Sequence, residues 1–195
     1  MAGDDLPPME FFRTLMRKVR RVPFSYVIKS TAGVDVIPLG EEDEGVLNEI
    51  YKASVEVVQE SQGEDFSSLR PNEMGNRLEQ MLRAKLRGVI PENKAAGYPD
   101  MLLERGGNYY YVEVKLAEEG EMGSSLRTFY YEPTELPKVR KSARHVIVGF
   151  LHRSRKVVGF KVVDASRIRV DLKVEFNASN LELYRGENVL REYWD

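Results

Sequence analysis

The sequence predicts an α/β protein with a central mixed β-sheet flanked by helices. Helical patterns come first along the chain, and short strand-like segments dominate its C-terminal half. The chain has 195 residues, of which 42% are hydrophobic, so it is long enough and apolar enough to bury one core. We therefore expect residues 1–195 to form a single domain.

Three segments have the spacing of amphipathic helices. Apolar side chains recur at helical intervals in residues 8–22, 41–61 and 72–88. Gly88 follows the last apolar position of the third segment and is expected to end that helix. The first segment is also basic, and packing of its apolar face is the simplest interpretation.

Four further segments predict strands. Residues 24–39 read as two short strands around a turn at residues 31–33. In the C-terminal half, residues 145–153, 156–165 and 168–176 are rich in β-branched side chains and are each expected to form a strand.

Composition excludes several classes of protein. The chain has no cysteine, so it has no disulfide, thiolate metal site or cysteine nucleophile. That composition fits a reducing compartment, and we expect a cytoplasmic protein. The N-terminus is acidic and has no apolar stretch typical of a secretory signal. The longest apolar run, at residues 146–151, is too short to span a bilayer, so no membrane is expected as a partner.

The stretch GYPDMLLERGGNYYYVEVKLAEEG, residues 97–120, predicts a β-hairpin that brings two acids together. The Gly106-Gly107 pair suits a two-residue turn with positive φ. The numbers of opposed residues then sum to 213, so Asp100 faces Glu113, about 5 Å apart at Cβ. Lys115 lies two residues beyond Glu113 and points to the same side of the strand.

Two carboxylates placed so closely repel each other, and a cation between them relieves the repulsion. Carboxylate oxygens on a rigid strand suit Mg²⁺, which takes few protein ligands and keeps several waters. The pairing depends on register: a three-residue turn would instead place Asp100 opposite Val114. The alternative to a metal site is a surface strand with an ion pair, a common arrangement of small energetic value.

A third acid is expected from the helix before the hairpin, and two glutamates are candidates. Glu79 follows Leu78 on the apolar flank of the helix with Leu82, which favours an inward orientation. Glu73 lies in the first turn, where a glutamate commonly favours the helix dipole. We prefer Glu79, and the sequence leaves the choice between the two open.

Glu79 on a helix, then Pro99-Asp100, then Glu113-Val114-Lys115, resembles the PD-(D/E)xK nuclease superfamily, and most of all a type II restriction endonuclease. The segment PNEMGNRLEQML is similar to the first helix of that family, and PDMLLERGGNYYYVEVK is similar to its central hairpin. The resemblance covers about residues 71–151. It implies a restriction-endonuclease-like fold. We expect a catalytic core at 71–165, N-terminal helices and short strands at 1–70, and C-terminal strands at 166–195.

The resemblance also implies roles for individual residues. Asp100 and Glu113, with the carbonyl of Val114, would bind Mg²⁺, for which Mn²⁺ can substitute. Lys115 would position or activate the attacking water, and Glu79 would complete the outer shell of the metal. Such enzymes cut double-stranded DNA as homodimers and leave a 5′-phosphate and a 3′-hydroxyl.

A basic stretch follows the hairpin in a chain whose net charge is −2. Between residues 124 and 156, eight cations stand against two acids, which indicates either a solvated surface or contacts with DNA phosphates. Given the nuclease resemblance, we expect DNA contacts from Arg127, Tyr130, Lys138, Arg140, Lys141 and Arg144.

Two other functions stay open at this level. A junction resolvase of the same superfamily would cut branched DNA whatever its sequence, whereas a restriction enzyme reads base edges. A DNA-binding module without catalysis is the third possibility. The sequence gives neither a recognition site, a cut position nor a dimer surface, and it does not separate DNA from RNA.

Overall fold

The computed structural model describes residues 10, 13–14, 19–91, 97–121, 138–172 and 179–194. The chain divides into two compact units, Met1–Val22 with Val170–Asp195, and Pro23–Arg169. The larger unit contains every described residue that bears on function below. That residues 1–195 form one domain stays a prediction.

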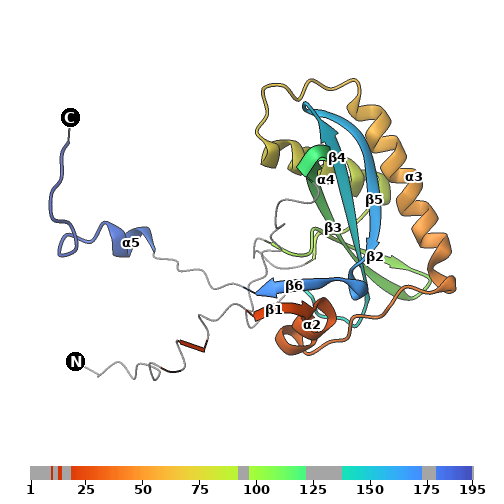
Figure 1. Cartoon of the computed structure of the whole chain (residues 1–195), viewed down its shortest axis with the longest axis horizontal. Coiled ribbons are helices and arrows are strands. Elements are labelled where there is room, and N and C mark those ends of the chain that lie inside the picture. Colours follow the sequence, from red (N-terminus) through yellow and green to blue (C-terminus); the bar gives the residue numbers. More distant parts are fainter. Residues whose placement is uncertain are drawn as a thin grey trace. The chain divides into compact units, whose positions relative to one another are not determined.

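The larger unit contains helices and strands in mixed order (Figure 1). In chain order they are α2 (Phe24–Ala32), η1 (Glu41–Asp43), α3 (Glu44–Ser61), α4 (Pro71–Leu86), β2 (Met101–Arg105), β3 (Asn108–Glu118), η2 (Glu119–Glu121), β4 (Arg144–Arg153), β5 (Lys156–Asp164) and η3 (Ala165–Arg167). The smaller unit holds most of a two-stranded sheet of β1 (Val19–Pro23) and β6 (Arg169–Leu172), and helix α5 (Asn180–Leu183). Within the ranges described, every helix is too short or too polar to cross a membrane.

A four-stranded mixed sheet forms the centre of the larger unit. Its strand order is β2-β3-β4-β5. The β2–β3 and β4–β5 pairs are antiparallel, and β3 and β4 are parallel. The predicted fold class, an α/β protein with a central mixed sheet flanked by helices, is confirmed. A parallel pair cannot be joined by a tight turn, so the chain needs the long connection between β3 and β4.

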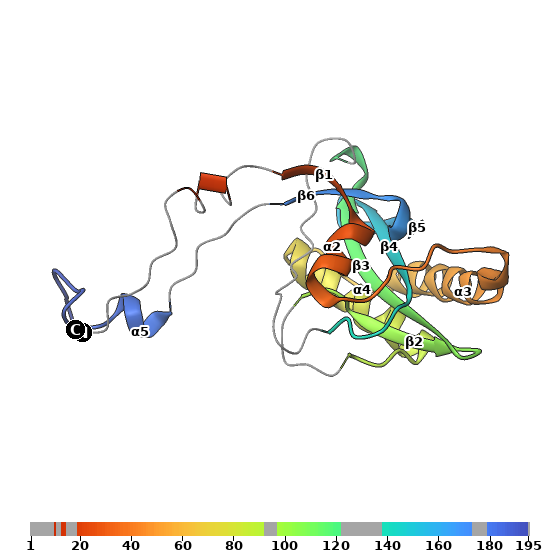
Figure 2. The same cartoon turned by 90° about the horizontal axis from the view of Figure 1, so that it is seen from below.

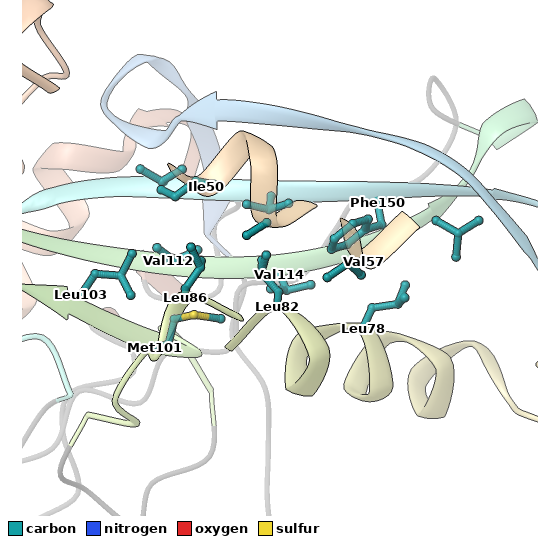
Figure 3. Close-up of a cluster of buried hydrophobic side chains, with 14 of the residues drawn as sticks. Ile50, Val57, Leu78, Leu82, Leu86, Met101, Leu103, Val112, Val114 and Phe150 are labelled. Carbon is teal, nitrogen blue, oxygen red and sulfur yellow. The ribbon is translucent and has the colours of Figure 1, made fainter. Parts of the chain in front are cut away.

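Helices α3 and α4 bury one face of this sheet, with α3 against β5 and α4 against β3 (Figures 1 and 2). Figure 3 shows their apolar side chains meeting those of the strands in one cluster, in which Leu82 of α4 lies by Val114 of β3. Side chains alternate along a strand, so Val112 and Val114 face the helices while Glu113 points to the other side. One strand therefore anchors the core and presents a charged face.

Two predictions of secondary structure near the N-terminus are wrong. Residues 24–32 form helix α2, not a strand: Phe24 and Ile28 lie one turn apart and are both buried, and Gly33, at φ 72°, ends the helix. Residues 19–23 form strand β1, so a helix does not run through the whole of residues 8–22. In both cases long-range contacts override a local pattern of apolar residues.

The remaining elements follow the sequence closely. Helix α3, helix α4 and strands β4 and β5 lie where they are predicted, and α4 ends at Leu86 with Arg87 as its left-handed cap. Strand β6 covers residues 169–172, and the rest of that predicted strand, 173–176, lies outside the described residues.

A buried ion network ties the segment before α3 to the sheet. Asp43 is fully buried and accepts hydrogen bonds from the Tyr110 hydroxyl at 2.6 Å and the Gly40 N–H at 2.9 Å. The Arg144 guanidinium lies 2.9 Å from the same carboxylate and also donates to Asn108 at 2.8 Å. Burial alone would raise the pKa of Asp43, but these hydrogen bonds outweigh it and hold the pKa below its usual value.

We predict that Arg144→Met lowers the free energy of unfolding by about 3–5 kcal/mol, because it leaves the Asp43 charge buried without its cation. Chemical denaturation measures the change. Arg153→Met is the matched control: Arg153 is exposed and pairs at the surface with Glu119, so its loss should cost no more than about 1 kcal/mol. Equal losses in the two variants would contradict a structural role of the Asp43 pair.

Candidate active site

The hairpin has the predicted register. Met101 pairs with Val112 and Arg105 with Asn108, so opposed residue numbers sum to 213. The turn is Gly106-Gly107, with φ of 56° and 76°, values that glycine adopts without strain. The alternative three-residue turn is excluded.

This register brings Asp100 to the beginning of β2, beside β3. The Val114 N–H donates a hydrogen bond of 2.7 Å to Oδ2 of Asp100. Glu113 is 2% exposed, and its Oε1 forms an ion pair with the Lys115 ammonium. Its Oε2 is also buried, and no residue in the described part of the chain donates to it. A buried carboxylate oxygen without a partner is costly, and it marks a place where a ligand can bind.

The electrostatics of the two acids are strongly perturbed. Burial, followed by the charge of Asp100, raises the pKa of Glu113 to about 7. Burial also raises the pKa of Asp100, although the Val114 N–H and the charges of Lys115 and Lys138 oppose that rise. Two acids that resist ionising together form an arrangement typical of metal and catalytic sites.

Helix α4 brings Glu79 to the same place, and Glu73 stays away from it. Burial and then the negative charge of Asp100 raise the pKa of Glu79, which also accepts a hydrogen bond of 2.5 Å from Arg83. Glu73 instead caps its own helix, since its Oε2 accepts the Arg70 N–H at 2.7 Å. The geometry favours Glu79 as the helix acid.

The predicted DNA contacts that the structure describes, Lys138, Arg140, Lys141 and Arg144, do not form one surface. Arg127 and Tyr130 lie outside the described residues. Arg140 and Lys141 are exposed, and the Lys141 ammonium lies 3.6 Å from the ring centroid of Tyr109. Lys138 and Arg144 turn inward: Lys138 reaches the acids, and Arg144 is only 8% exposed in the network with Asp43.

Some residues near the acids were not singled out from the sequence. Arg83 pairs with Glu79 and its charge acts on Asp100. The spacing of four residues between Glu79 and Arg83 on one helix was the available signal. Tyr98, two residues before Asp100, packs against His145, and nothing in their local sequence indicated that they would meet.

An aromatic cluster supports the segment that carries Asp100. Tyr98 is buried, stacks on His145 with ring centroids 5.8 Å apart, and shares a hydrogen bond with its Nδ1. Phe24 of α2 meets both rings edge-on at 5.5 Å. Aromatic packing of this kind fixes position as well as burying area, so it restrains the backbone just before Asp100.

The donor set fits one hard divalent cation with several waters. The Asp100 and Glu113 carboxylates, with the Val114 carbonyl, are oxygen donors of the kind that Mg²⁺ prefers. Oε2 of Glu113 has no hydrogen-bond partner among the described residues, so a cation could bind to it. Among the described residues, no group of three or more acidic or histidine side chains gathers as a ready-made metal cage. Two carboxylates and waters, not an all-protein cage, are therefore what the fold offers.

The chemistry of the side chains, and not a hollow in the surface, defines this candidate site. A cavity of about 670 Å³ lies between α3 and the end of β5, lined by residues such as Tyr51, Val162 and Arg167. None of the acids above lines it. It is an open hollow away from the perturbed carboxylates.

Comparisons with known proteins agree on one family. The model of the type II restriction enzyme MjaV family matches residues 16–187. The type II restriction enzyme MjaV of Methanocaldococcus jannaschii is 32% identical over 212 aligned positions, which cover 92% of each chain. No solved structure matches the chain.

We predict that His145 makes the fold sensitive to mild acid. Burial lowers the pKa of His145 to about 3, whereas an unfolded histidine titrates near 6.5. Below pH 6.5 the unfolded state binds a proton that the folded state does not, so stability falls as the pH falls. Between pH 7 and pH 5 the loss through this residue is about 2 kcal/mol.

Denaturation of wild type and His145→Gln at pH 7 and pH 5 measures this effect, and the variant should lose that part of the pH dependence. Val157→Ala is the control, because it lowers stability by removing buried methyl groups and leaves the titration intact. The interpretation fails if His145→Gln and Val157→Ala respond equally to pH.

Proposed function

Because the chain belongs to the type II restriction enzyme MjaV family, it is a restriction endonuclease, and we propose that it cuts double-stranded DNA at one short sequence with Mg²⁺ as cofactor. The predicted resemblance to a type II restriction endonuclease is confirmed by this membership. We propose further that the products carry a 5′-phosphate and a 3′-hydroxyl, and that Mn²⁺ substitutes for Mg²⁺.

One observation carries the proposed active site: Glu113 is buried beside the half-buried Asp100, and Oε2 of Glu113 has no partner in the described residues. A fold gains nothing from two buried acids that repel each other. A divalent cation held by these two carboxylates and the Val114 carbonyl would remove the repulsion. When bound, it would neutralise charge on the phosphate and make a bound water more acidic.

The other residues have roles that follow from position. Lys115 is partly exposed beside Glu113, so its ammonium can hold the attacking water and a phosphate oxygen. Glu79 lies near Asp100 and would orient a water of the metal through a hydrogen bond. Arg83 holds the Glu79 side chain in place.

We propose Arg140 and Lys141 as contacts with DNA phosphates, since both are exposed cations just before β4. Arg127 and Tyr130 remain proposed contacts from the sequence alone. Arg144 is left out, because its guanidinium is committed to Asp43 and Glu42.

A homodimer is proposed because a two-fold protein cuts both strands of a palindrome with one site on each subunit. The cytoplasm is the proposed location.

We predict that Asp100→Asn lowers the rate of DNA cleavage by about 10²-fold or more, because it removes one metal ligand. This change keeps an oxygen that can accept the Val114 N–H, so the hairpin stays in register. Lys115→Ala should lower the rate by about 10²–10⁴-fold through loss of the group that positions the water. The assay uses plasmid DNA with Mg²⁺, with Ca²⁺ and with EDTA.

Discrete fragments that need Mg²⁺ and disappear in both variants would support a sequence-specific nuclease with this site. Cleavage of a branched junction alone would favour a resolvase-like activity instead. Undiminished cleavage in both variants would mean that the active site lies elsewhere.

We predict that the two helix glutamates differ in kind. Glu79→Gln should lower the cleavage rate by about 10–100-fold, as loss of an outer-shell partner does. Glu73→Gln should leave the rate unchanged and lower the free energy of unfolding by about 1 kcal/mol or less, because Glu73 only caps α4. Single-turnover rates together with denaturation curves separate the two effects. A larger loss of rate in Glu73→Gln than in Glu79→Gln would reverse the assignment.

A further inference from the structure

Lys138 forms hydrogen bonds within the protein, which differs from what is expected of a lysine that contacts a DNA phosphate. Its ammonium donates to the Gly97 carbonyl at 2.6 Å and to the Pro99 carbonyl at 3.3 Å, and the side chain is partly buried. A lysine ammonium has three N–H donors, so two of them are already committed to this backbone. These carbonyls flank Tyr98 and immediately precede Asp100.

The charge of Lys138 also acts on three acids. It opposes the rise that burial causes in the pKa of Glu79, of Asp100 and of Glu113. Asp100 lies near both of the other acids, since its charge raises the pKa of each of them. The Lys138 ammonium acts on all three acids and also hydrogen-bonds to the backbone just before Asp100. It is therefore placed to influence the position of the Asp100 carboxylate.

The backbone before Asp100 is held from two sides. On one side Tyr98 packs against His145 and Phe24 in the buried aromatic cluster. On the other side the Lys138 ammonium holds the carbonyls of residues 97 and 99. The two restraints differ in kind, because the aromatic packing fixes the ring of Tyr98 and the hydrogen bonds fix the peptide planes next to it. Together they define the direction in which the Asp100 side chain leaves the chain.

We infer that Lys138 is a positioning residue of the active site, which sets the Asp100 carboxylate for metal binding by holding the Gly97 and Pro99 carbonyls. The inference rests on the proposed function, in which Asp100 is a metal ligand. It replaces the expectation that Lys138 contacts a DNA phosphate. A compact ammonium suits the task, since its three N–H donors spread from one nitrogen, whereas a guanidinium presents its donors in a fixed planar fork.

Binding of Mn²⁺ to the full-length, metal-free protein tests the inference without any cleavage. Lys138→Met removes both charge and hydrogen bonds, and Lys138→Arg keeps the charge. Loss of charge alone would strengthen Mn²⁺ binding, because the acid cluster becomes more negative. Loss of position weakens it. We expect both variants to bind Mn²⁺ about 10-fold more weakly or worse, and to need correspondingly more Mg²⁺ for half-maximal cleavage.

Lys161→Met is the control, because Lys161 is exposed on β5, and it should bind Mn²⁺ as wild type does. Denaturation curves confirm that each variant is folded, and Lys138→Gln replaces Lys138→Met if that variant does not fold. Mn²⁺ binding equal to or tighter than wild type in Lys138→Met would overturn the inference. So would unchanged metal binding with weaker binding to DNA and a salt dependence reduced by about one charge, the result for a phosphate contact.

The same measurements separate this inference from the proposed function. Wild type that binds Mn²⁺, with binding lost in Asp100→Asn, supports the metal site whatever Lys138 does. If wild type binds no Mn²⁺, the proposed metal site fails and this inference fails with it. If wild type binds and the Lys138 variants bind equally well, only the role of Lys138 is wrong.

Discussion

The proposed active site depends on holding two carboxylates close together, the half-buried Asp100 and the buried Glu113. Burial disfavours the charged form of Glu113, the nearby charge of Asp100 adds to that effect, and together they raise the pKa of Glu113 to about 7. The pair does not stabilise the sheet. The two acids stay together because the backbone fixes their positions: the Gly106-Gly107 turn sets the register, and the Val114 N–H holds the carboxylate of Asp100. A local cost in an otherwise well-packed unit is what a site kept for function looks like.

Strand β3 contributes side chains both to the core and to the proposed site, and its core packing offsets the repulsion between Asp100 and Glu113. Its side chains alternate, so Val112 and Val114 join the cluster under α3 and α4 while Glu113 points away from it. The residue that anchors the strand and the residue that carries the charge are therefore neighbours in the chain. A shift of Glu113 would pull the neighbouring Val112 and Val114 out of the cluster that they form with α4 side chains such as Leu82, and close-packed interiors resist such a shift. The apolar packing on the other face of β3 therefore holds Glu113 in position beside Asp100.

Local rules predicted this hairpin, because a two-residue glycine turn and the alternation of a strand are enough to fix which residues face each other. The same rules favoured Glu79 over Glu73 and left that choice open. They failed where the deciding contact is remote. Residues 24–32 have the composition of a strand but form α2, because Phe24 finds Tyr98 and His145 some 70 to 120 residues later in the chain. Arg144 reads as one more cation of a basic stretch, yet its partner Asp43 lies about 100 residues earlier and draws it inside. Charge counted along the sequence does not say which side of the surface a charge occupies.

That division of the basic stretch changes how attraction to DNA should be understood. The chain is slightly acidic overall, so no general field draws it to a polyanion. Of the described cations between residues 138 and 144, the inner ones neutralise acids of the protein itself, and Arg140 and Lys141 remain on the surface. A cation that already balances an internal acid contributes little to binding a phosphate, since its counter-charge is built in. Between residues 138 and 144, the exposed cations Arg140 and Lys141 are therefore the ones proposed to contact DNA phosphates, and in the proposed homodimer their number on one duplex would double. The same proposed assembly would place one acid pair at each strand.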